Sequence, residues 1–128
     1  MKKRLLLITI FLVVGLIIIY IITIPKVTKW TYKINKNYVV KKESDTDIYL
    51  YNKKDKVVAD YIAEFSYGKK FVLLKCVDTN VNIKFYIIDM SSDTMYGPFL
   101  DYTSYEVIRD EVVKEKTGKW IETINYKK

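Results

Sequence analysis

Few residue types suited to chemistry occur in this chain. It has no histidine and a single cysteine, Cys76, among 128 residues. The sequence therefore excludes Ser-His-Asp and Cys-His catalytic sites and zinc sites built from Cys and His. It also excludes an internal disulfide bond, which needs two cysteines. The four glycines stand apart at positions 15, 68, 97 and 118, so the chain lacks a glycine-rich phosphate-binding loop.

Two pairs of aspartates have a spacing that metal binding or catalysis can use. Asp45 and Asp47 resemble the start of a calcium loop, but Leu50 stands where that loop requires glycine, so we interpret them as a solvated turn. Asp89 and Asp93 flank two serines, and a carboxylate pair in a cleft can act as general acid and base. Aspartates around a hairpin are ordinary turn formers. We therefore expect no catalytic residue, no metal ligand and no cofactor.

The strongest signal in the chain is an uncharged block from Leu5 to Ile24, in which sixteen of twenty residues are Leu, Ile, Val or Phe. A helix of this length measures about 30 Å, which matches the hydrocarbon core of a bilayer. The sequence therefore predicts a transmembrane anchor over residues 5–24. The side chains expected to face lipid include Leu5, Ile10, Val14, Ile18 and Ile22.

The residues around this block bear on its cleavage and its orientation. Residues 1–4 are basic, as in a cleaved signal peptide, but the apolar block exceeds the usual signal core of about 7 to 15 residues and no small-residue cleavage site follows it. We expect an uncleaved anchor. The basic start favours a cytoplasmic N-terminus, whereas six lysines from Lys26 to Lys42 favour the reverse. We place residues 25–128 outside the cytoplasm, because long domains translocate largely regardless of charge.

Short segments rich in β-branched and aromatic residues, separated by turn residues, follow the anchor. They predict one domain with an antiparallel meander of five or six strands, beginning with a hairpin between Trp30 and Val40. Residues 57–67 alternate like a strand, but Val58, Ile62 and Phe65 also have helical spacing, so a short helix is the alternative. The other strand signals lie at 48–51, 71–77 and 83–90.

One helix is predicted near the C-terminus. Beyond Pro98, apolar residues recur at steps of three and four from Tyr105 to Val112, and Gly118 stands where a helix would stop. The start is expected within 101–104, through either an aspartate cap or a capping box. The tail, 119–128, adds a strand or a second helical turn. The predicted fold class is α+β, with the C-terminal helix across one face of the sheet.

Charge and tyrosine content favour binding over catalysis. Lys26 to Lys56 carries nine lysines against four acidic residues, while Val57 to Lys128 carries ten basic and eleven acidic residues. The basic segment can contact anionic headgroups or acidic wall polymers, although a solvated lysine-rich edge explains it equally well. Twelve tyrosines can supply a binding face. We do not expect nucleic acid as a partner, because the anchor keeps the basic segment at a membrane. Contacts with the lipid bilayer surface are expected from Lys26, Lys29, Trp30 and Lys33.

The stretch from Tyr86 to Phe99 reads YIIDMSSDTMYGPF and precedes the charged helix. It resembles a pattern in small, functionally uncharacterised, membrane-anchored or lipid-linked envelope proteins of low-GC Gram-positive bacteria. The resemblance implies a strand that ends at Asp89, a turn containing Asp93, and a Tyr96-Gly97-Pro98 segment that leads into a helix. We expect Gly97 and Pro98 to end the strand and to set the direction of the chain. Lipidation is not carried over, because the lipid-accepting cysteine is missing.

These observations lead to three functional hypotheses. The first is a non-catalytic, membrane-anchored envelope protein that binds a protein partner or an acidic surface polymer, for example as an immunity or exclusion protein. The second is an accessory subunit of a larger membrane complex, for which the apolar block offers only Thr9, Gly15 and Thr23 as packing positions. The third is an enzyme acting on wall or lipid material, which requires an acid pair such as Asp89 and Asp93 to line a cleft.

Overall fold

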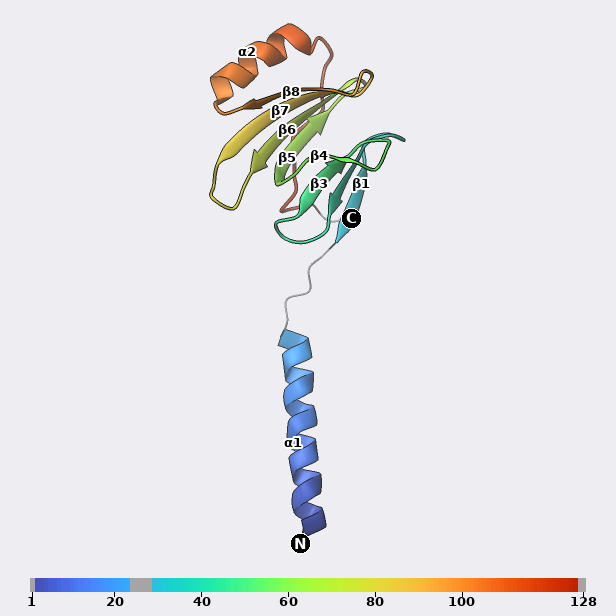
Figure 1. Cartoon of the computed structure of the whole chain (residues 1–128), viewed down its shortest axis with the longest axis vertical. Helices are drawn as coiled ribbons and strands as arrows, with labels where there is room; N and C mark the ends of the chain where they lie inside the picture. The colour runs from blue at the N-terminus through green and yellow to red at the C-terminus, as the bar shows by residue number, and fades with distance from the viewer. Residues whose placement is uncertain (1, 24–28, 127–128) are drawn as a thin grey trace.

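The computed structural model describes residues 2–23 and 29–126 (Figure 1). The described residues contain two helices: α1 spans Lys2–Thr23, ahead of the strands, and α2 spans Tyr102–Val112, between β8 and β9. The strands of the described residues are β1 Trp30–Lys33, β2 Val39–Lys42, β3 Ile48–Tyr51, β4 Val57–Ala59, β5 Ile62–Tyr67, β6 Phe71–Val77, β7 Ile83–Asp89, β8 Thr94–Phe99 and β9 Ile121–Glu122. The α+β class is confirmed, with nine strands in place of the expected five or six.

The strands form two antiparallel sheets. The four-stranded sheet has the order β1-β2-β3-β4, and the five-stranded sheet has the order β8-β7-β6-β5-β9. The interpretation of residues 57–67 as strand is confirmed, but the segment is divided between the two sheets at Asp60 and Tyr61. Tyr61 has φ of 54°, an uncommon conformation for a residue other than glycine, at the point where the chain changes sheet. The short β9 completes the five-stranded sheet and resolves the tail as a strand.

The five-stranded sheet is buried on both faces. Along β6, Val72 and Leu74 belong to the core shared with the four-stranded sheet, whereas Phe71 and Leu73 belong to the core under α2. Successive side chains of a strand point to opposite faces, so a continuous apolar run needs cover on both sides. Figure 1 shows the resulting three layers, in which the five-stranded sheet lies between α2 and the four-stranded sheet.

Helix α1 is apolar around its whole circumference. The mean hydropathy within Lys2–Ile22 reaches 3.3, and this stretch is not buried against the rest of the described chain. The five residues expected to face lipid are 47 to 75 % exposed. The helix is long and apolar enough to span a membrane, a property that it shares with signal sequences.

Helix α2 begins where the sequence predicts and ends earlier. Asp101 is the N-cap, and its Oδ1 accepts a hydrogen bond from the backbone N–H of Ser104 at 2.8 Å. The buried ring of Tyr105 stacks on Phe85 with 4.9 Å between centroids, which fixes the helix on the sheet. The helix ends at Val112, so the expectation that Gly118 stops it is wrong.

The segment after α2 is held by Glu115 instead of by further helix. The carboxylate of Glu115 accepts backbone N–H groups from Lys69, Lys70 and Phe71 at 3.1, 2.9 and 2.8 Å. Lys69 and Lys70 lie in the β5–β6 turn and Phe71 begins β6, so Glu115 supplies an acceptor where the chain turns between the two strands. Gly68 permits the approach, because a Cβ at this position would lie 2.6 Å from Glu115 Oε1.

Gly97 and Pro98 lie inside β8 and do not end it, which corrects the sequence prediction. On either side of them, Tyr96 pairs with Ile87 and Phe99 pairs with Phe85. Gly97 and Pro98 therefore lie opposite one residue of β7, position 86, and form a bulge. Proline is tolerated there because β8 is an edge strand and needs no outward donor. Gly97 has φ of 114° and passes so close to Phe85 O that a Cβ would lie 2.7 Å away.

Replacing Glu115 with alanine should lower the free energy of unfolding by about 2 kcal/mol, because three backbone donors lose a charged acceptor. Urea unfolding of the full chain in lipid nanodiscs, followed by tryptophan fluorescence, measures the change. Glu111→Ala is the matched control, since Glu111 is an exposed acid in α2. Equal stabilities of the two variants would contradict the role assigned to Glu115.

Candidate functional site

The outer face of the four-stranded sheet is the candidate functional site. Its strands alternate, so Trp30, Val40, Ile48, Leu50 and Ala59 point into the core between the sheets. The residues at the positions between them point outward and are exposed or half-buried. We call this surface the lysine–tyrosine face, and its members are Thr31, Lys33, Val39, Lys41, Tyr49, Tyr51 and Val57.

Lysine and tyrosine side chains contact one another on this face. Lys41 Nζ lies 5.0 Å from the centroid of the Tyr51 ring, and the rings of Tyr49 and Tyr51 meet edge to face at 6.0 Å. Partial burial, together with a hydrogen bond to the Asp47 carboxylate, raises the pKa of Tyr49. None of the residues in β1 to β4 is acidic. The strands of the face therefore offer positive charge over aromatic surface, and the carboxylates that act on Tyr49, those of Asp47 and Asp60, come from the flanking segments.

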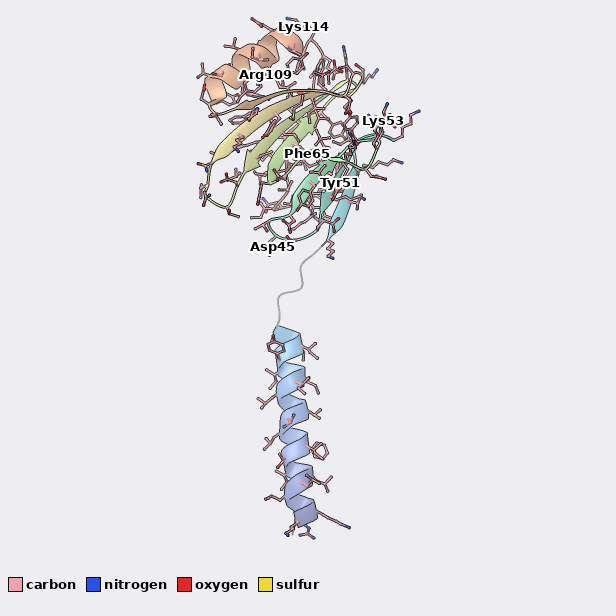
Figure 2. All side chains as sticks on the ribbon, in the orientation of Figure 1. Asp45, Tyr51, Lys53, Phe65, Arg109 and Lys114 are labelled. Atoms are coloured by element: carbon pink, nitrogen blue, oxygen red, sulfur yellow. The ribbon has the colours of Figure 1, made fainter. Side chains whose placement is uncertain are left out.

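Charge differs between the two ends of this sheet. The β2–β3 turn, at the end where β1 begins, carries three acidic residues within 43–47. The turns at the other end carry Lys36 and three lysines within 53–56, against the single Asp55. Figure 2 shows Asp45 and Lys53 at these opposite ends, with Tyr51 between them. The turns are thus net positive only at the end away from α1, while Lys29 and Lys42 stand at the tethered end beside the acidic turn.

The residues predicted to touch the membrane surface differ in their exposure to solvent. Lys26 lies outside the described residues, while Lys29 and Lys33 are exposed. Trp30 is only 5 % exposed, and its ring packs edge-on against Tyr126 at 4.7 Å between centroids. Its large apolar surface is used inside the sandwich, so the structure does not present Trp30 to a headgroup.

Asp89 and Asp93 have separate structural partners. Asp89 Oδ1 accepts from Ser91 N and Oγ at 3.0 and 2.6 Å, and Lys70 lies 3.7 Å from its other oxygen. Burial opposes ionisation of Asp89, but these partners together hold its pKa below the usual range. Asp93 accepts hydrogen bonds from the Tyr38 hydroxyl and from Asn52 Nδ2. Both carboxylates therefore fix the β7–β8 turn, Asp93 by linking it to the four-stranded sheet.

Two of the hollows on the described part of the domain bear on these hypotheses. The larger, with a volume of about 790 Å³, lies between the sheets beside Lys42 and Asp45. The smaller, of about 230 Å³, lies on the α2 side, lined by Phe85, Tyr102 and Trp120. Neither is lined by Asp89 or Asp93, so this pair does not line a cleft in either hollow. Asp45 and Asp78 do line the larger hollow, where Asp45 pairs with Lys42 and Asp78 accepts backbone hydrogen bonds from Asn80 and Asn82.

Reactive and metal-binding groups do not gather in the described part of the chain. Its His, Cys, Asp and Glu residues form no group of three that could hold a metal ion. Burial, with a smaller contribution from the Asp60 carboxylate, raises the pKa of the Cys76 thiol to about 12. The thiol is therefore protonated at neutral pH and is a poor nucleophile.

The sequence predicted the basic segment but not the face that it forms. Lys33, Lys41, Tyr49 and Tyr51 share one surface because of the register of three strand pairs. Within each strand the sequence offered one signal for this face: side chains two positions apart, such as Tyr49 and Tyr51, point to the same side of a sheet. Register between strands was missing, and a shift of one residue would turn Lys41 inward.

Removing the Asp93 carboxylate should cost more stability than removing the Tyr38 hydroxyl. Asp93→Ala leaves the buried hydroxyl without its acceptor, at about 1–3 kcal/mol, and adds backbone strain because position 93 has φ of 54°. Tyr38→Phe costs about 1 kcal/mol because Asp93 retains Asn52 and water. Urea unfolding of the full chain measures both, and the double variant should be less destabilised than the sum. Strict additivity of the two changes would contradict the link.

In comparisons with known proteins, no family model, no curated protein and no solved structure matches the chain. Function must therefore be argued from the surfaces of the domain and from its helix α1.

Proposed function

We propose that this chain is a membrane-anchored, non-catalytic binding protein that holds an anionic polymer on its lysine–tyrosine face. The observation that carries the proposal is the charge of this sheet. Lys33 and Lys41 stand on an outer surface whose strands contain no acidic residue, beside Tyr49 and Tyr51. A repeating negative charge fits such a surface better than a single small anion, because the ammonium groups are spread over the face and the far turns.

The tyrosines give this face more than charge. Lys41 rests over the ring of Tyr51, so its ammonium group is already positioned before a partner binds. A tyrosine ring also offers apolar surface to the backbone of a polymer and a hydroxyl to its polar groups. Preorganised charge beside aromatic surface favours binding without any requirement for turnover.

The anchor and the opposite charges at the two ends of the four-stranded sheet support a partner that lies away from the protein's own membrane. Helix α1 acts as the anchor, and Trp30 follows Thr23 by seven residues, so the chain between them spans at most about 25 Å. The acidic β2–β3 turn lies at this tethered end, and the lysine-rich turns lie at the other. The lysine-rich turns lie at the end of the sheet away from the bilayer, so we assign their lysines and those of the face to an outside polymer and not to lipid headgroups.

We place the domain outside the cytoplasm, in the envelope of a low-GC Gram-positive bacterium, in keeping with the Tyr86–Phe99 pattern. A role in immunity or exclusion, through an acidic protein in place of a polymer, uses the same face. Binding of protein alone, with no affinity for polymers, would redirect the proposal to that role.

Polymer binding is tested with inorganic polyphosphate and the full chain in nanodiscs of neutral lipid. The double variant Lys33→Met/Lys41→Met should bind roughly 30-fold more weakly, since two lysines contribute about 1 kcal/mol each. Affinity should also fall steeply between low and physiological salt. Fluorescence anisotropy of labelled polyphosphate measures both effects.

The matched control removes the same charge from the opposite layer. Lys114 and Lys116 are exposed after α2, and Figure 2 shows Lys114 on the far side of the domain from Tyr51. Lys114→Met/Lys116→Met should bind polyphosphate almost as tightly as the parent. Equal losses in the two double variants would mean that net charge alone drives binding, and the face would lose its assigned role.

Orientation has its own test in cells. Protease added to intact cells should remove the domain, whereas an epitope placed before Lys2 should be protected until the membrane is opened. Protection of the domain together with digestion of the N-terminal epitope would reverse the assigned topology.

A further inference from the structure

The larger hollow lies between the two sheets, at the end where the chain leads to α1. Its volume, about 790 Å³, is in the range of small-molecule sites. Ile48, Ile62 and Val77 line it, and Ile124 stands at its wall with 82 % exposure. The Thr123 hydroxyl also lines the hollow, but it already donates a hydrogen bond to Ile62 O at 2.7 Å, so its proton does not need an acceptor on the ligand. The hollow therefore suits an apolar chain.

Two opposite charges stand in a fixed order at this hollow. Lys42 is the inward neighbour of Lys41, and its side chain is 12 % exposed. Asp45 lies 3.6 Å from the Lys42 ammonium, with a side chain that is 77 % exposed. From inside to outside, a ligand therefore meets apolar surface, then positive charge, then negative charge. Asp78 also lines the hollow, but its Oδ1 accepts from the backbone of Asn80 and Asn82, so it is used by the β6–β7 turn.

We propose that this hollow binds one acyl chain of a zwitterionic phospholipid. In such a lipid the phosphate follows the acyl region and the ammonium group is outermost, which complements the order of Lys42 and Asp45. The lipid phosphate pairs with Lys42 and its ammonium group pairs with Asp45, replacing the ion pair between the two side chains.

The source of this ligand is the membrane that holds the chain. Trp30 begins β1 and is paired in register with Lys42, so the hollow lies beside the tethered end of the sheet. Because at most about 25 Å of chain separates Trp30 from Thr23, the domain stays within reach of the bilayer surface. Figure 2 shows Asp45 at this same end of the domain.

The test uses photoreactive lysolipids and the full chain in nanodiscs of phosphatidylglycerol, an anionic host lipid. One probe is a lysophosphatidylcholine with a diazirine in its acyl chain, and the other is the matching lysophosphatidylglycerol. Mass spectrometry maps the crosslinks, and labelling of α1 provides the internal reference, since any lipid can contact that helix. We expect the choline probe to label β5 and β6 saturably. For each probe, labelling of β5 and β6 is divided by labelling of α1, and this ratio should be roughly tenfold higher for the choline probe than for the glycerol probe.

Matched variants separate this site from the lysine–tyrosine face. Lys42→Met and Asp45→Asn should each reduce the ratio for the choline probe roughly tenfold, because each removes one charge contact. Lys41→Met should weaken polyphosphate binding and leave the lipid labelling unchanged. Lys42→Met should reduce the lipid labelling and leave polyphosphate binding unchanged. Ala63→Trp, which fills the hollow, should also abolish labelling of β5 and β6.

Several results would overturn the inference. Labelling confined to α1, or placed at the smaller hollow beside Trp120, would show that the inter-sheet hollow holds no lipid chain. Equal labelling by the two probes would remove the assigned headgroup. Labelling of Lys42→Met and Asp45→Asn at the wild-type level would also contradict the assigned headgroup. These two variants test the proposal even if Ala63→Trp does not fold.

Discussion

Burial of β6 and β7 on both faces is the constraint on which the rest of the domain depends. Their apolar residues alternate between the core under α2 and the core shared with the four-stranded sheet. A small chain of this kind cannot leave either face in water without losing much of its hydrophobic stabilisation. The four-stranded sheet therefore acts as a covering layer, and its own outer face is left without a cover.

This arrangement explains why the charged residues gather where they do. The inner positions of β1 to β4 are used by the core, so the lysines of the basic segment occupy the outer positions and the turns. The neighbouring lysines Lys41 and Lys42 have different surroundings, one over the ring of Tyr51 and the other beside the inter-sheet hollow. One basic dipeptide thus contributes to two surfaces, for which we propose a polymer and a lipid as ligands.

The sequence predicted those features that depend on local pattern. The apolar block, the start of α2 within 101–104 and the strand signals at 48–51, 71–77 and 83–90 are periodicities or short motifs, and they were located correctly. Strand β8 was not predicted. The division of residues 57–67 between two sheets was not predicted, because Tyr61 carries no glycine-like signal for its positive φ. The end of α2 was misplaced because Glu115 bonds to a turn more than forty residues away. The lysine–tyrosine face needed strand register, which only the packed sheet determines.

Hydrogen exchange of the full chain in neutral nanodiscs, with and without polyphosphate, tests the central claim most directly. The account predicts that amides of β6 and β7 exchange slowest in both samples, and that polyphosphate slows exchange in β1 to β3 and the turn at 52–56 while leaving α2 unchanged. Protection that falls on α2 and β8, or that appears nowhere in the four-stranded sheet, would contradict the account.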